Sequence, residues 1–169
     1  MISVNALQNL TEVMRMMAAT ERFIAEFYRT CAELWPEDRD FWLDVVAEEE
    51  KHARNIEEMA KIVSAKPERF ELGRAFNPAA IRTVMTGIEG QVDRLKKGLI
   101  TRDRLMIVAR DIEASVMEKS YREIVRTTDL EYLNLVKEIV EDTSRHKSAI
   151  EKRCEEISAQ GKGATCTKP

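Results

Sequence analysis

The sequence predicts an all-α protein: a four-helix bundle built from two helical hairpins that a long helical crossover connects. Only 6 glycines and 4 prolines occur in 169 residues, too few for the frequent turns of a β-sandwich or barrel. Charged residues make up 34% of the chain and hydrophobic residues 44%, a balance typical of amphipathic helices. Apolar residues also recur at alternating spacings of three and four over long stretches, as on a helix with one buried face.

The first hairpin is predicted from the first third of the chain. One helix runs from Val4 to about Leu34, and Pro36 prevents its continuation. Acidic residues after Pro36 favour the start of a second helix, which runs to about Val63. The first apolar stripe consists of Leu7, Leu10, Met14, Met17, Ile24, Tyr28 and Cys31, with Glu21 in its middle. The second consists of Trp42, Val45, Ile56, Met59 and Val63, with Glu49 and His52 in its middle.

The crossover segment spans residues 64–100. Its first part, residues 64–77, contains proline and glycine and is predicted as an irregular connection. Pro78 suits the first turn of a helix, and apolar residues recur at helical spacing after it. We therefore expect a fifth helix that links the two hairpins.

The second hairpin is predicted to consist of one helix over about Arg102–Thr127 and another over about Leu130–Ile157. The bundle forms a single domain, residues 1–158. A small, basic and flexible tail, residues 159–169, is expected after it.

The two hairpins repeat one pattern. An offset of 92 residues places Glu21 on Glu113, and an offset of 94 residues places His52 on His146. The chain contains only these two histidines, and they fall at equivalent positions. The hairpins therefore look like two copies of one unit.

Five polar residues lie on the apolar stripes at about the same depth: Glu21, Glu49, His52, Glu113 and His146. A buried polar group without a partner costs roughly 1–3 kcal/mol, and an unpaired carboxylate far more. Carboxylates and imidazoles that converge inside a bundle are good ligands for iron, manganese or zinc. We therefore predict a metal centre. The alternative is a buried polar network whose members satisfy one another without a metal.

This set resembles the ligands of the ferritin-like di-iron carboxylate proteins. In that class one Glu comes from each of two helices, and a Glu-x-x-His comes from each of the other two. Within the class the chain is most similar to the diiron domain of rubrerythrin, over residues 5–155. Glu21 resembles the first single glutamate, Glu49–His52 the first Glu-x-x-His, and Glu113 the second single glutamate.

The resemblance implies a non-haem iron protein that reduces peroxide or oxidises ferrous iron. Glu49 is then expected to bridge two ions, with Glu21 and Glu113 as terminal ligands and a histidine at each end. Tyr28 and Tyr121 lie where rubrerythrin-like sequences often carry tyrosines beside the metals. The alternative for both tyrosines is an ordinary core aromatic with one hydrogen bond.

The chain departs from the family pattern in its last helix. The residue three before His146 is Thr143, where the second Glu-x-x-His would carry its glutamate. Asp142 is the neighbouring carboxylate, and a π-bulge would turn it inward as a further ligand. Val116 also replaces an additional glutamate that rubrerythrin carries three residues after Glu113. No four-cysteine rubredoxin module is present in the sequence, so electrons are expected from a separate donor protein.

Charge counting leaves the number of ions open. Four carboxylates neutralise two divalent ions, whereas three leave a charge of +1 that a bound hydroxide cancels. A centre with two irons and a centre with one are both compatible with this set. A second hypothesis is a metal-binding or iron-handling protein in which Thr143 marks a degenerate site without turnover. A third is a purely structural bundle that acts through its surface.

Composition excludes several other classes of function. The net charge is −3 with 27 basic and 30 acidic residues, so the sequence predicts neither nucleic-acid binding nor attraction to an anionic membrane. No stretch approaches 18 apolar residues, so the sequence predicts no membrane span, and a secretory signal is not expected either. Three cysteines without a Cys-x-x-Cys pair favour a reducing compartment, and we expect a cytoplasmic protein. A homodimer is expected from the apolar face of the crossover helix.

Overall fold

The computed structural model describes residues 3–115 and 118–159. Within these ranges the helices are α1 (Val4–Leu34), α2 (Arg39–Ala65), α3 (Pro78–Lys96), α4 (Arg102–Ser115) and α5 (Leu130–Ala159). Short 3₁₀ segments cover Pro36–Asp38, Pro67–Arg69 and Glu118–Glu123, and the strands are β1 (Phe70–Leu72) and β2 (Val125–Thr127). The described chain is thus predominantly helical, as the sequence predicts. The predicted tail lies outside the described residues except for Ala159, with which α5 ends.

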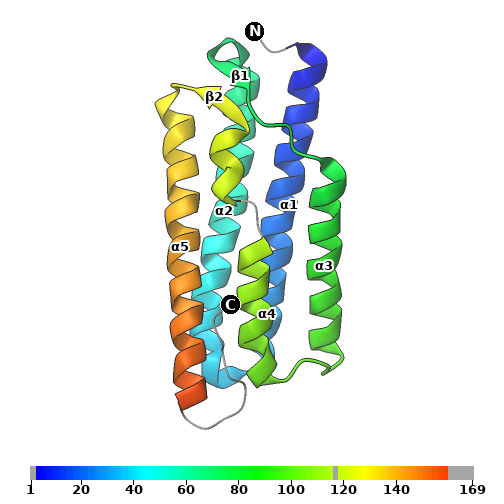
Figure 1. Ribbon diagram of the computed structural model, residues 1–169, viewed down its shortest axis with the longest axis vertical. Helices are drawn as coiled ribbons and strands as arrows, with labels where there is room; N and C mark the ends of the chain where they lie inside the picture. The colour runs from blue at the N-terminus through cyan, green and yellow to red at the C-terminus, as the bar shows by residue number, and fades with distance from the viewer. Residues whose placement is uncertain (1–2, 116–117, 160–169) are drawn as a thin grey trace.

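The long helices lie side by side along the long axis of the molecule (Figure 1). α1 packs against α2, and α4 packs against α5; these are the two pairs that the sequence predicts as hairpins. α2 also packs against α5 and so joins the pairs. α3 packs along α1, on the right in Figure 1, and returns the chain from the end of α2 to the start of α4.

The prediction of one helix over Arg102–Thr127 is wrong. The described part of α4 reaches Ser115, and from Glu118 on the chain is a 3₁₀ segment and then β2. Four of the five residues from Ile124 to Thr128 are β-branched, which favours extended backbone there. Val116, which the prediction placed inside this helix, lies outside the described residues. Tyr121 consequently lies on the 3₁₀ segment and not on a continuous helix.

A small antiparallel sheet at one end of the molecule accounts for this change. β1 and β2 pair with Phe70 opposite Thr127, so part of the predicted irregular connection is a strand. Gly73 follows β1 closely against the neighbouring backbone. A Cβ atom at this position would lie 2.0 Å from the carbonyl oxygen of Glu123, so only glycine fits. The sheet therefore fixes the segment that carries Tyr121.

The core consists of two apolar clusters with a polar layer between them. The first includes Ile24, Phe27, Tyr28, Trp42, Leu105, Ile112 and Ile150. The second includes Met14, Met17, Ile56, Met59, Tyr121, Val136 and Ile139. Along each of α1, α2 and α5, buried polar residues separate the members of one cluster from those of the other. The polar groups are thus held at one level between two layers of well-packed side chains.

The end of the molecule opposite the sheet is held by a buried carboxylate. Asp38 lies between α1 and α2 and accepts hydrogen bonds from Arg102 of α4, at 2.7 Å and 3.0 Å, and from Arg153 of α5, at 2.6 Å. Burial opposes ionisation of this carboxyl group, but the two guanidinium groups prevail and lower its pKa. This cluster connects the two helix pairs.

Among the described residues no helix combines the length and the apolar character that a membrane span requires.

Candidate metal centre

The five residues predicted as metal ligands come together in the polar layer. Glu21 lies on α1, Glu49 and His52 on α2, Glu113 on α4, and His146 on α5. All five side chains are buried, and none of the five residues is more than 6% exposed. The helical stripes of the sequence explain this convergence, because each residue occupies a core-facing position of its helix. Four helices therefore contribute to one site.

Glu49 lies at the centre of this site. Its Oε2 atom is 3.2 Å from Nδ1 of His52, and its Oε1 atom is 3.1 Å from Nδ1 of His146. Each carboxylate oxygen thus faces a different imidazole ring. A carboxylate that presents its two oxygens in two directions has the arrangement needed to bridge two cations.

The donor atoms fall into two groups of three that share Glu49. Donor atoms of Glu21, Glu49 and His52 lie within 4.8 Å of one another, and so do those of Glu49, Glu113 and His146. Each group offers two carboxylates and one imidazole, a donor set that suits iron, manganese or zinc. The residues present therefore fit two adjacent metal positions. A single ion at either position also finds three protein ligands.

Electrostatics keep the central carboxylate charged. Burial opposes the ionisation of Glu49, but hydrogen bonds and positive charge from His146 and His52 prevail and hold its pKa at about 2. The carboxylate is consequently ionised at neutral pH and available as an anionic ligand. A bound cation would replace the protons that the imidazoles share with it.

The two predicted tyrosines each contact a glutamate of the other helix pair. The hydroxyl group of Tyr28 donates to Oε1 of Glu113 at 2.5 Å, and that of Tyr121 donates to Oε1 of Glu21 at 2.6 Å. Burial, together with the nearby Glu113 carboxylate, raises the pKa of Tyr28 well above its usual value. This phenol therefore stays protonated and orients the carboxylate that accepts its hydrogen bond.

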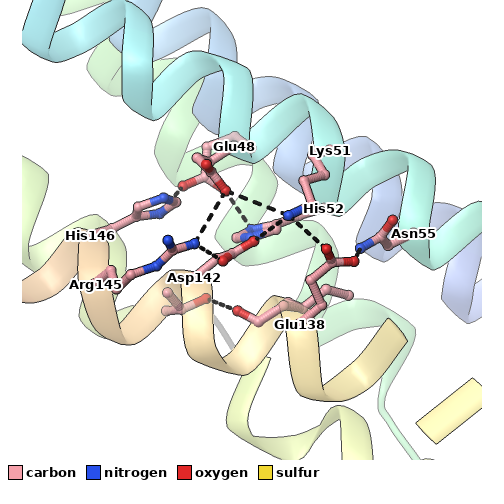
Figure 2. Close-up of polar contacts among 11 residues, drawn as sticks. Glu48, Lys51, His52, Asn55, Glu138, Asp142, Arg145 and His146 are labelled. Carbon is pink, nitrogen blue, oxygen red and sulfur yellow. Dashed lines mark hydrogen bonds and ion pairs between the residues drawn. The ribbon is translucent and has the colours of Figure 1, made fainter. Parts of the chain in front are cut away.

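Asp142 lies on the outer side of His52, between α2 and α5 (Figure 2). Its Oδ2 atom is 3.5 Å from Nε2 of His52 and 3.0 Å from Nζ of Lys51, and Arg145 also pairs with it. No π-bulge occurs in the described part of α5, so the expected route for turning Asp142 inward is wrong. The regular helix already buries this carboxylate. It faces the ring nitrogen that points away from Glu49.

A third group of potential donors, Glu48, His52 and Asp142, lies within 4.8 Å beside the two central groups. Lys51 already forms an ion pair with Asp142 and approaches Glu48 to 3.9 Å. An acceptor on the outer nitrogen of a ligating histidine is a common feature of metal sites. Asp142 is therefore better placed to orient His52 than to hold an ion.

Thr143 does not replace the carboxylate that the family pattern expects. Its side chain is buried, and its hydroxyl group donates to the carbonyl oxygen of Ile139 at 2.9 Å. The hydroxyl is thus engaged by its own helix, as is common for threonine inside helices. The second helix pair accordingly supplies one carboxylate, from Glu113, and one imidazole.

Sequence reasoning missed the two cations beside Asp142. Lys51 and Arg145 directly precede the two histidines, and the same offset of 94 residues relates them. A basic residue before each histidine was the signal in the sequence that could have identified these two cations. Lys51 also contacts Glu138 at 2.8 Å, and Asn55 donates to the same glutamate at 2.9 Å, so the network extends along the α2–α5 contact (Figure 2).

Comparison of the chain with protein-family models, with curated proteins and with solved structures gave no match.

Proposed function

We propose that this protein is a ferritin-like four-helix bundle that holds non-haem iron and reduces peroxide or oxidises ferrous iron, as its resemblance to rubrerythrin implies. One observation carries the proposal: Glu49 presents each of its oxygens to a different histidine, at 3.1 Å and 3.2 Å, inside two donor groups that share it. Two hydrogen bonds from the imidazoles would also satisfy Glu49, but two adjacent cations account in addition for the buried carboxylates of Glu21 and Glu113 in the same two groups.

Each side chain would have its own role at such a centre. Glu49 would bridge, Glu21 and Glu113 would be terminal ligands, and the histidines would bind through Nδ1. When bound, iron would supply a Lewis acid and an electron source for a peroxide or oxygen substrate. The hydroxyl groups of Tyr28 and Tyr121 hold one oxygen of each terminal glutamate, at 2.5 Å and 2.6 Å, and so fix their orientation. Buried side chains on both sides of the layer exclude bulk water.

The proposed reaction also requires a source of electrons. Peroxide reduction consumes electrons, and the sequence contains three cysteines, fewer than the four of a rubredoxin site. A separate electron-donor protein would therefore restore the ferrous state. We propose in addition a cytoplasmic homodimer, with manganese or zinc as alternative metals.

The proposal is tested by anaerobic titration of the metal-free protein with ferrous iron, followed by addition of peroxide. We expect uptake of two ions, and an optical band of an oxo-bridged ferric pair after the peroxide. One tightly held ion without oxidation would instead support the metal-binding hypothesis without turnover. Absence of uptake would contradict both and leave a structural bundle. Glu48→Gln is the matched control, since Glu48 precedes Glu49 but belongs to neither shared group.

Thr143 is the observation that favours the hypothesis without turnover, and the variant Thr143→Glu tests whether the missing carboxylate at this position limits metal binding. A fourth carboxylate at this position completes the family's Glu-x-x-His. We expect the affinity for a second ferrous ion to rise about tenfold, or about 1.4 kcal/mol. The metal-free variant should lose about 3 kcal/mol of stability, because it buries another unpaired charge. Metal titration and denaturant unfolding measure the two effects.

Thr143→Gln is the control for this experiment, because glutamine has the size of glutamate without its charge. It should leave the second affinity unchanged. A Thr143→Glu variant that binds the second ion no better than the original chain would show that the side chain at this position does not reach the metal.

A further inference from the structure

A stacked tyrosine–tryptophan pair lies beside the candidate centre. Tyr28 of α1 and Trp42 of α2 are both fully buried, and their rings are 5.3 Å apart at an interplanar angle of 9°. Phe41, which is partly exposed, contacts the same indole edge-on at 4.7 Å. The aromatic rings therefore form a continuous path that begins one hydrogen bond from Glu113 and runs outward.

The indole is an unusual choice for this position if it serves packing alone. Trp42 makes no hydrogen bond through Nε1 within the described part of the chain. A buried donor without a partner costs about 1–3 kcal/mol, which phenylalanine or leucine would avoid. Tryptophan differs from those residues in that its ring is readily oxidised by one electron. Its presence thus favours a redox role.

The pair belongs to one side of the centre only. The offset of 94 residues that relates the histidines places Trp42 on Val136, an aliphatic residue. Tyr121 contacts Glu21 as Tyr28 contacts Glu113, but the hairpin repeat gives it no tryptophan. The molecule thus contains an internal control: two equivalent tyrosines, of which Tyr28 is stacked on an indole.

We propose that the Tyr28–Trp42 pair donates one electron to the metal centre through Glu113 during peroxide reduction. This inference rests on the proposed function. It gives a function to the stacking of Tyr28 on Trp42, which the hydrogen bonds from the two tyrosines to glutamates do not explain. It applies when ferrous iron occupies only one of the two positions, since a single ferrous ion provides one electron where peroxide requires two.

The electrons and protons of this step balance. Hydrogen peroxide takes up two electrons and two protons and gives two molecules of water, with cleavage of its O–O bond. One electron comes from ferrous iron, which is oxidised to ferric iron. The second leaves Tyr28 while its phenolic proton passes to Oε1 of Glu113. An electron from Trp42 then restores Tyr28 and the proton returns, which leaves an indole radical cation. Both protons consumed come from solvent.

The test uses the full chain loaded with one equivalent of ferrous iron, mixed with peroxide and frozen for electron paramagnetic resonance. We expect a tryptophan radical whose spectrum changes when the protein carries ring-deuterated tryptophan. Trp42→Phe and Tyr28→Phe should reduce its yield at least tenfold. Trp35→Phe, which removes the other tryptophan, should retain it.

The outcomes separate this inference from the function on which it rests. Iron uptake and peroxide consumption without an organic radical would overturn the inference and leave the function standing. A radical that persists in Trp42→Phe, or that is insensitive to ring deuteration, would overturn it as well. Failure to take up iron would overturn both. Ring deuteration identifies a tryptophan radical in the unmodified sequence, and its retention in Trp35→Phe assigns it to Trp42, so the question is decided even where Trp42→Phe or Tyr28→Phe does not fold.

Discussion

Glu49→Gln is expected to weaken the binding of both ferrous ions severely. Glu49 belongs to both central donor groups, so its loss leaves each with one carboxylate and one imidazole. Glutamine keeps the size of the side chain but removes the charge that two cations would share. We expect each affinity to fall at least 100-fold, or about 2.7 kcal/mol. Anaerobic titration against a coloured chelator measures this loss.

Three variants serve as comparisons. Glu21→Gln and Glu113→Gln each disrupt one group and should each weaken one ion while leaving the other bound. Glu48→Gln removes an equal charge from the adjacent position of α2 and should leave the binding of both ions intact. A Glu49→Gln protein that still binds two ions would contradict the central role of this carboxylate, and with it the assignment of the shared groups.

The long helices follow from the sequence because packing and local preference agree there. α1 begins at Val4 and ends at Leu34, as the apolar stripe and Pro36 predict. The hydroxyl group of Ser3 accepts a hydrogen bond from the amide of Ala6 and caps the helix start. The second hairpin was harder to predict. The stripe around Glu113 continues at helical spacing, but the described part of α4 reaches only Ser115, and Val125–Thr127 pair with β1 as a strand.

The residues of the candidate site could be predicted from the sequence, but the contacts between their side chains could not. Polar residues on an apolar stripe are identifiable in one sequence, and the hairpin repeat places them at one level. Contacts between helices depend on rotation and register, which the sequence does not show. Tyr28 therefore contacts Glu113 of the other pair instead of Glu21 on its own helix. The placement of Asp142 beside His52 without any helical irregularity is a tertiary effect of the same kind.

Loading with metal is expected to raise the melting temperature substantially. A ligand that binds only the folded state stabilises it by about 4 kcal/mol when its concentration is 1,000 times the dissociation constant. For a chain of this size, each kcal/mol corresponds to roughly 2–4 °C. We therefore expect the iron- or manganese-loaded protein to melt roughly 8–16 °C above the chelated protein. Calorimetry on samples of verified metal content measures the difference.

The shift should be large because metal removal leaves an unfavourable arrangement in the core. Glu21, Glu49 and Glu113 are buried carboxyl groups in two overlapping donor groups, so without a cation they either repel one another as anions or take up protons, and both cost free energy. Hydrogen bonds from the tyrosines and histidines reduce this penalty without removing the charge. Glu49→Gln, whose affinities are expected to be at least 100-fold weaker, should retain at most about one third of this shift. An unchanged melting curve of the original chain after complete metal removal would contradict every metal-binding hypothesis, because the buried acids would then be stable on hydrogen bonds alone.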